Sequence, residues 1–299
     1  MLKARVLYGL FTASIVLGAP APEVPTDMDI LNFALTLEHM ESAFYSGALA
    51  KYGERDFVDD GLPDWVHGRF VQIAQHEAEH VKFLTTALGE KAVKPCQYSF
   101  PYDSPRSFAE MAMVFETVGS SAYLGSAKFL TDNADYLTAA GSILAVEARQ
   151  ASWITASVMK LQPWNGPFDV PLTASGAFSL ASPFIKDCPA TNAALPVKTF
   201  PALKLSSSSP VPGTQISIDL GTPTGARTSG PAYVAWLDGL QAVYTELSVD
   251  GKTTVPQSLR GTVYAAVVNE QQPPSDENML SGFTVIQFPF DSRASGPEV

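Results

Sequence analysis

Residues 75–80 read Gln-His-Glu-Ala-Glu-His, and this stretch permits two interpretations that lead to different proteins. As H-E-x-x-H, with His76, Glu77 and His80, it is the signature of a zinc peptidase, in which two imidazoles lie one helical turn apart beside a glutamate base. As E-x-x-H, with Glu77 and His80, it is half of the di-metal carboxylate motif of ferritin-like helix bundles. The rest of the chain has to decide between the two.

Four long segments, with apolar residues spaced three and four apart, predict amphipathic helices. Good N-terminal signals open them at Thr26-Asp27, Pro63-Asp64 and Ser104-Pro105, and the fourth runs from about residue 133 to residue 161. Four apolar stripes are buried most simply in a four-helix bundle, which we place at residues 26–163.

Each predicted helix carries a glutamate on its inward stripe, namely Glu38, Glu77, Glu116 and Glu147. A carboxylate in a dry interior costs several kcal/mol, and four together also repel one another. Shared protons would neutralise them but give no reason for His80 to lie on the same face. Two divalent cations would balance the four charges, so the pattern predicts a metal site. For any single glutamate the alternative is an edge position with access to water.

Four motifs in order carry a family resemblance: LNFALTLEHMESAFY (31–45), IAQHEAEHVKFL (73–84), VFETVGSSAYLGSAKF (114–129) and SILAVEARQASWI (142–154). They resemble the ferritin-like domain of fungal secreted stress-response and late-sexual-development proteins. PCQYSFPY (95–102) and SPFIKDCP (182–189) are similar to loop elements of that family and contain both cysteines. The resemblance covers residues 26–190 and does not extend to the C-terminal part.

The resemblance implies a set of metal ligands: Glu38, Glu77, His80, Glu116, Glu147 and the residue at position 150. It also implies that Tyr45, seven residues after Glu38, lies beside the metal as a hydrogen-bonding or redox partner. Position 150 departs from the family pattern, which expects histidine where this chain has Gln150.

An amide oxygen is a weaker ligand than imidazole for iron or zinc, so the two halves of the site are expected to differ. The half with Glu38, Glu77 and His80 should bind more strongly than the half with Glu116, Glu147 and Gln150. Two ions, one ion and an empty, degenerate site all stay open. Glu41, one turn after Glu38, is either an additional ligand or an edge residue.

The zinc-peptidase interpretation lacks the H-x-x-G-x-x-H continuation, although Glu116 could supply a third ligand. On the helix His80 shares the inward face of Glu77, whereas His76 lies toward the flank, so we expect His76 beside the site or at the surface. Tyr45 and Tyr123 are expected chiefly as core residues with a bonded hydroxyl.

Beyond the bundle, residues 164–198 are rich in proline and predict a loop segment, with a short helix near residues 174–180 that packs on the bundle. From residue 199 to 291 the pattern alternates in short runs such as AYVAWL and GTVYAAVVN, and Asp238-Gly239 predicts a hairpin turn. Such strands predict an immunoglobulin-like β-sandwich, followed by a disordered tail at 292–299. The expected fold class is multidomain α and β, a ferritin-like four-helix bundle followed by this sandwich.

Residues 1–19 combine Lys3 and Arg5 with an apolar run at 6–17 and then small residues and prolines. This predicts a signal peptide cleaved between residues 18 and 21, the alternative being an uncleaved anchor, although the run is shorter than the about 20 residues of a span. We therefore expect an extracellular or cell-wall protein. In an oxidising compartment Cys96 and Cys188 are expected to form a disulfide worth roughly 4 kcal/mol, with two free buried thiols as the alternative.

The chain of 299 residues has a net charge of −11 and only 19 lysines and arginines. This balance argues against nucleic acid and anionic membrane surfaces as partners, and no segment after the N-terminal run is expected to span a membrane. An oxygen-rich ligand set favours iron or manganese, one or two ions, over copper or zinc.

The leading hypothesis is a secreted ferritin-like protein, a di-metal oxidoreductase that reacts with dioxygen or peroxide in a stress response. The first alternative is a non-enzymatic structural or developmental protein with a degenerate metal site, which meets a cell-surface partner through its β-sandwich. The less favoured alternative is the zinc peptidase.

Overall fold

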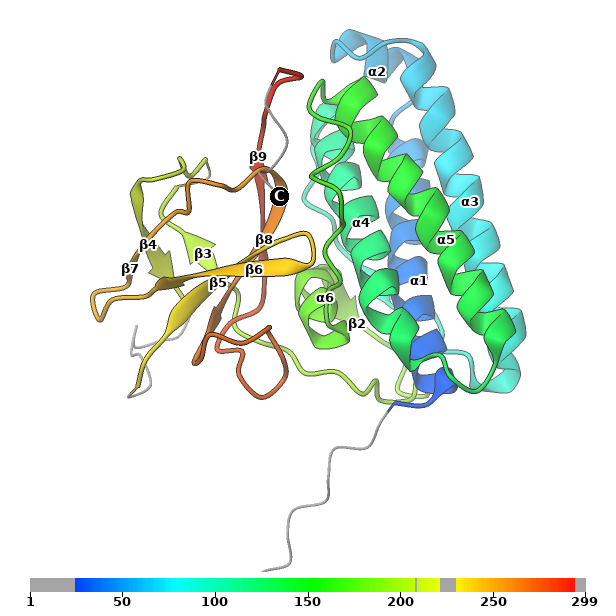
Figure 1. Ribbon diagram of the computed structural model, residues 1–299. Coiled ribbons are helices and arrows are strands. Elements are labelled where there is room, and N and C mark those ends of the chain that lie inside the picture. Colours follow the sequence, from blue (N-terminus) through cyan, green and yellow to red (C-terminus); the bar gives the residue numbers. More distant parts are fainter. Residues whose placement is uncertain (1–24, 208, 221–229, 294–299) are drawn as a thin grey trace, which may run out of the picture.

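The computed structural model describes residues 25–207, 209–220 and 230–293. The predicted signal peptide lies outside these residues, as does most of the predicted C-terminal tail. Within them, a helical bundle is followed by two antiparallel sheets, so the predicted fold class is confirmed. Figure 1 shows the bundle on one side of the molecule and the sheets on the other.

Four long helices form the bundle: α1 (Asp27–Lys51), α3 (Trp65–Leu88), α4 (Pro105–Ser126) and α5 (Ala134–Trp153). Side chains cap three of their N-termini, because Thr26, Ser104 and Asn133 accept hydrogen bonds from the first turns of α1, α4 and α5. α5 is shorter than predicted and ends in a π-helical turn, η3 (Ile154–Val158). The periodicity did not predict the short α2 (Glu54–Asp59).

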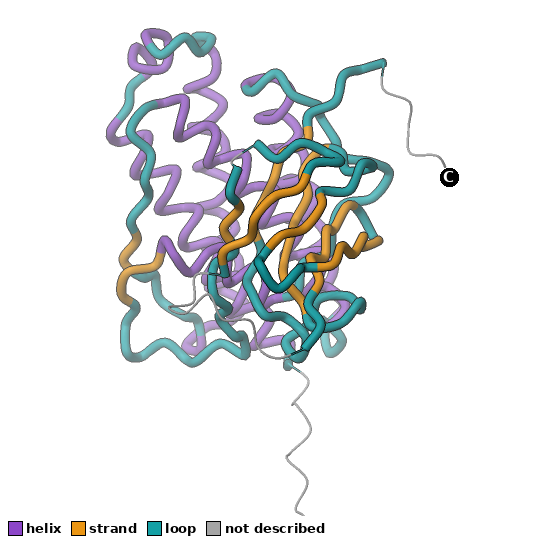
Figure 2. Tube along the Cα trace, turned by 90° about the vertical axis from the view of Figure 1, so that its left-hand side faces the viewer, coloured by secondary structure: helices purple, strands orange, loops and turns teal. Residues whose placement is uncertain are grey.

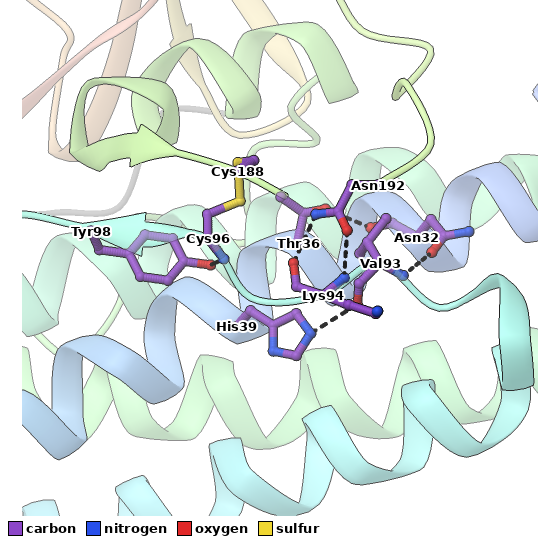
Figure 3. The surroundings of a disulfide bond; sticks show 9 residues. All are labelled: Asn32, Thr36, His39, Val93, Lys94, Cys96, Tyr98, Cys188 and Asn192. Carbon is purple, nitrogen blue, oxygen red and sulfur yellow. Dashed lines mark hydrogen bonds between the residues drawn. A yellow bond between two sulfur atoms is a disulfide. The ribbon is translucent and has the colours of Figure 1, made fainter. Parts of the chain in front are cut away.

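The segment between α3 and α4 is fixed to α1 and to a distant loop (Figure 3). Asn32 on α1 accepts a hydrogen bond from Val93 N at 3.0 Å, and Lys94 and Asn192 exchange two hydrogen bonds. β1 (Gln97–Tyr98) pairs with β2 (Ile185–Asp187). Beside this pair, Cys96 and Cys188 form the predicted disulfide, which joins positions separated by 92 residues.

A short helix, α6 (Ala174–Ala181), packs against α4, and Leu172 N donates to Ser121 O on α4 at 3.0 Å. Two sheets follow. The first has the order β3-β4-β7, with β3 (Lys204–Leu205), β4 (Gln215–Asp219) and β7 (Lys252–Thr254). The second has the order β6-β5-β8-β9, with β5 (Tyr233–Asp238), β6 (Gln241–Glu246), β8 (Gly261–Val268) and β9 (Thr284–Phe288).

The hairpin between β5 and β6 differs from its prediction by one residue. Asp238 pairs with Gln241, so the two turn residues are Gly239 and Leu240 rather than Asp238 and Gly239. Gly239 has a φ of 73°, and a glycine in this conformation at the first turn position is typical of a type II′ hairpin.

Figure 2 shows the sheets in front of the bundle helices. In the four-stranded sheet the inner strand β8 is buried along its whole length, whereas the edge strand β6 is partly exposed. One face, including Val234, Trp236 and Val267, packs on the three-stranded sheet. The opposite face, including Leu237 and Tyr264, belongs to the same apolar core as the bundle. The core therefore crosses the predicted boundary between bundle and sandwich. Among the described residues, no helix is both long and apolar enough to cross a membrane.

Candidate metal centre

The four glutamates predicted on the inward stripes are buried in the middle of the bundle. Glu38 lies on α1, Glu77 on α3, Glu116 on α4 and Glu147 on α5, and their exposed fractions are 0, 0, 1 and 1%. The helical periodicity that assigned them to the core therefore holds for all four.

Four side chains converge closely enough to hold a metal ion. Glu38, Glu77, His80 and Glu147 each offer one ligand atom, and these atoms all lie within 4.8 Å of one another. Three helices contribute to this group, which we call the Glu/His cluster. Its donors are three carboxylates and one imidazole, a set that suits hard or borderline cations.

The cluster is electrostatically costly without a counter-charge. Burial, followed by the charge of Glu77, raises the pKa of Glu38 from 4.5 to about 7, although a hydrogen bond from His80 opposes the shift. Burial raises the pKa of Glu116 and Glu147 well above the usual value, and neighbouring carboxylates add to the shift. Protons or cations must therefore neutralise these groups.

His80 lies between two of the carboxylates. Its Nδ1 is 2.9 Å from Glu77 Oε2 and 3.3 Å from Glu38 Oε2. Burial would lower the pKa of His80, but the hydrogen bonds and charges of Glu38 and Glu77 outweigh this and raise it to about 10. Without a metal the imidazolium supplies a positive charge at this position, and a metal ion would take over that role.

Two tyrosines donate hydrogen bonds to buried carboxylates. Tyr45, fully buried, donates to Glu116 Oε1, and Tyr123 donates to Glu38 Oε1 at 2.6 Å. The family resemblance implied a role beside the metal for Tyr45, whereas Tyr123 was expected only as a core residue. Tyr123 lies seven residues after Glu116, two turns along the same helix. This spacing places both side chains on one face of α4 and could have indicated that Tyr123 lies at the site.

Gln150 faces the cluster with its amide nitrogen. Gln150 Nε2 donates to Glu77 Oε1 at 3.0 Å and lies 3.2 Å from His76 Nδ1. His76 is exposed and does not belong to the Glu/His cluster, as its flanking position on the helix predicted. A zinc peptidase would need both imidazoles of H-E-x-x-H on one ion, and this arrangement does not provide that.

Several buried oxygens around the cluster accept no hydrogen bond from the described residues: Glu147 Oε1, Glu147 Oε2 and Gln150 Oε1. Glu38 Oε2 has only the 3.3 Å contact with His80. Buried acceptors without donors are rare, because each loses its hydration without compensation. The carboxylate oxygens among them could coordinate a bound cation. The residues present therefore fit a metal ion on the chemistry of their donors.

A fifth carboxylate, Glu41, lies next to the same centre. Its exposed fraction is 4%, and burial, with the charges of Glu38, Glu77 and Glu116, raises its pKa well above the usual value. A Cβ atom at Gly119 on α4 would lie 2.8 Å from Glu147 Oε2 and 2.9 Å from Glu41 Oε1. The missing side chain at Gly119 thus leaves the space that these two carboxylates share.

Comparison with known proteins agrees with this architecture. Residues 26–160 match the sequence model of a family described as ferritin-like domain. The chain is also 25% identical over 312 residues to Protein rds1 of Schizosaccharomyces pombe, an alignment that covers 85% of this chain and 77% of that protein. These matches confirm the predicted resemblance to a ferritin-like fungal family.

Proposed function

Because residues 26–160 carry a ferritin-like domain, we propose that this chain is a secreted protein that binds one or two iron or manganese ions in its bundle. The observation that supports this most is the convergence of four buried ligand atoms within 4.8 Å. Carboxylate oxygens outnumber nitrogen donors there, which favours iron or manganese over copper or zinc.

Glu38, Glu77, His80 and Glu147 would hold the first ion, and Glu116 lies beside them. When bound, iron or manganese supplies one-electron redox chemistry toward dioxygen or peroxide. The surrounding residues orient the ligands: Tyr123 holds Glu38, Tyr45 holds Glu116 and Gln150 holds Glu77 through hydrogen bonds. Phe44, Phe70 and Phe108 are completely buried near Tyr45 and exclude water from that side.

Elemental analysis of the purified protein tests the proposal. We expect close to one or two equivalents of iron or manganese per chain, and loss of most of this metal in the double variant Glu77→Ala, His80→Ala. Glu79→Ala is the matched control, because it changes an exposed carboxylate on the same helix and should leave the metal content unchanged.

Two results would contradict the proposal. One is a wild-type protein that takes up neither iron nor manganese when metal-free protein is incubated with either ion. The other is chelator-sensitive proteolysis that disappears in His76→Ala, which would support a zinc peptidase. Bound metal without any turnover of peroxide or dioxygen would instead favour the non-enzymatic alternative.

Secretion is a separate part of the proposal. It is supported by the sequence of residues 1–19 and by the disulfide between Cys96 and Cys188. We expect the protein in the culture medium, with an N-terminus that begins after residue 18. Retention of the intact N-terminus in the cell would contradict this part without affecting the metal site.

A further inference from the structure

We propose that Glu41 is a metal ligand that acts together with Glu147 in the space above Gly119, in place of the imidazole missing at position 150. This inference rests on the proposed metal binding and names a residue of that same site. The ion it implies is a hard cation such as manganese(II), held by carboxylate oxygens.

The first observation is the position of Glu41 in α1. It follows Glu38 by three residues, so both side chains lie on neighbouring turns of one face. Both carboxylates are buried, and Glu41 Oε1 and Glu147 Oε2 both lie within 3 Å of the Cβ position at Gly119. A purely structural carboxylate would be expected at the surface or paired with a cation, whereas Glu41 is buried and forms no ion pair with the described residues.

The second observation concerns Glu147, which points into the same space. Its exposed fraction is 1%, and neither of its carboxylate oxygens accepts a hydrogen bond from the described part of the chain. An unpaired carboxylate at this depth is costly unless a cation compensates it. Glu147 therefore points to a ligand independently of the acidic character of the cluster.

Gly119 makes this arrangement possible. A Cβ atom at this position would lie 2.9 Å from Glu41 Oε1 and 2.8 Å from Glu147 Oε2. Any other residue at this position of α4 would push one of the two carboxylates away. The glycine therefore brings oxygens from α1 and α5 together on the surface of α4.

Gln150 provides no imidazole at the position where the family pattern expects histidine. Its amide nitrogen donates to Glu77, while its amide oxygen has no partner among the described residues. Through this nitrogen, Gln150 orients the carboxylate of Glu77. Gln150 is thus a positioning residue for Glu77, and Glu41 supplies the donor that a histidine would otherwise bring.

Titration of metal-free protein with manganese(II), followed by the electron paramagnetic resonance signal of the free ion, tests the proposal. Glu41→Gln keeps the size of the side chain and removes its charge. We expect this variant to lower the affinity for the most weakly bound manganese ion by about tenfold or more, the range seen when groups around a metal site are changed. Glu79→Gln, at an exposed position of α3, is the matched control and should bind as the wild type does.

Thermal unfolding of the same samples separates a ligand from a structural residue. Without metal, Glu41→Gln should raise the melting temperature at neutral pH, because a buried amide does not have to take up a proton on folding as a buried carboxylate does. With manganese, the gain in melting temperature should be smaller than in the wild type. Gly119→Ala should weaken manganese binding without changing any donor, whereas Gly141→Ala, which meets no atom within 4 Å, should not.

The outcomes are distinct. If the wild type binds manganese and Glu41→Gln binds it with unchanged affinity, the role of Glu41 is overturned while the metal site stands. The same holds if Glu41→Gln lowers the melting temperature of the metal-free protein and leaves manganese binding intact. If the wild type binds no manganese and no iron, the proposed function itself fails, and the role of Glu41 fails with it.

Discussion

At the level of single residues, the bundle interior holds more carboxylates than its apolar surroundings can accommodate unaided. Glu38, Glu41, Glu116 and Glu147 all have raised pKa values, first because burial removes their hydration. A metal-free protein must keep part of this set protonated. The folded state then binds protons that the unfolded chain does not, and stability becomes dependent on pH.

The first prediction is that the metal-free protein loses stability as pH rises. For Glu38 the pKa is 4.5 when unfolded and about 7 when folded, so its contribution is complete below pH 4.5 and is lost as pH rises through about 7. His80 acts in the same direction at higher pH, because its pKa rises from 6.5 to about 10 on folding. Denaturant unfolding with a chelator present should show a loss of a few kcal/mol between about pH 5 and about pH 8.

Two comparisons test the origin of this slope. Glu38→Gln should flatten it, because the variant cannot release the proton. Added manganese(II) should flatten it too, because metal ligands stay deprotonated in the folded state. A stability that stays constant or increases over this pH range would show that the buried carboxylates do not titrate as described.

The same residues show how far sequence reasoning reaches. Periodicity brought Glu38, Glu77, His80 and Glu147 to one place, because each is spaced three or four residues from apolar residues of its own helix. Periodicity could not decide whether Glu41 is an additional ligand or an edge residue, because α1 has no clear outer face. Residues 30–38 of this helix are all buried. The segment after α3 covers α1, with Asn32 bonded to Val93 and Phe44 in contact with Phe100. Such coverage by a distant segment leaves no trace in the pattern of one helix.

At the level of elements, strong local signals predicted the long helices, whereas the short elements α2 and β7 were not predicted. Thr26 and Ser104 cap α1 and α4 as their sequence positions indicated. α2 has six residues and β7 has three, too few to show a period of their own. They form because they contact neighbouring elements: α2 packs against α3, and β7 pairs with β4. Tertiary contacts therefore decide elements such as α2 and β7, which are too short to show a period.

The second prediction concerns the contact between α4 and the segment that leads into α6. A Cβ atom at Gly125 would lie 1.7 Å from the carbonyl oxygen of Leu172, which is backbone and has no freedom to turn away. Gly125→Ala should therefore lower the free energy of unfolding by about 3 kcal/mol or more, as overpacking does at rigid sites. Chemical denaturation of the purified variant measures this.

Gly141→Ala provides the matched control for that substitution. Gly141 lies within α5, is exposed, and has no atom within 4 Å of its added Cβ. Alanine is the better helix former, so this variant should gain about 0.5–1 kcal/mol. Equal effects of the two substitutions would mean that the segment around Leu172 does not press on α4 as the structure has it.

At the level of the whole molecule, bundle and sheets are held together by a continuous core. Alternate residues of β8 face opposite sides, so Val263 and Val267 pack on the smaller sheet while Tyr264 and Ala266 face the bundle. Burial on both sides explains why this strand reads as a nearly unbroken apolar run in the sequence. The run predicted a strand, but it could not tell which partner covers its second face.

Polar contacts fix the relative position of the two parts. The hydroxyl of Tyr264 donates to Thr117 O on α4 at 3.0 Å and lies 3.0 Å from Ser121 Oγ. Burial raises the pKa of Tyr264, which keeps the hydroxyl protonated as a donor. Because Thr117 directly follows Glu116, this contact joins the sandwich to the helix that carries one of the buried glutamates.

The third prediction is that Tyr264→Phe weakens the contact between the bundle and the sheets without creating a cavity in the core. Loss of one buried hydroxyl that donates and accepts should cost about 1–2 kcal/mol of unfolding free energy. Hydrogen exchange measured by mass spectrometry should show faster exchange in peptides from both α4 and β8, because each loses a partner. Tyr244→Phe on β6 is the control, since among the described residues its hydroxyl enters no hydrogen bond, and it should change neither peptide. Faster exchange confined to β8 would show that the bundle does not depend on the sandwich for its stability, and that the shared apolar core is not a cooperative unit.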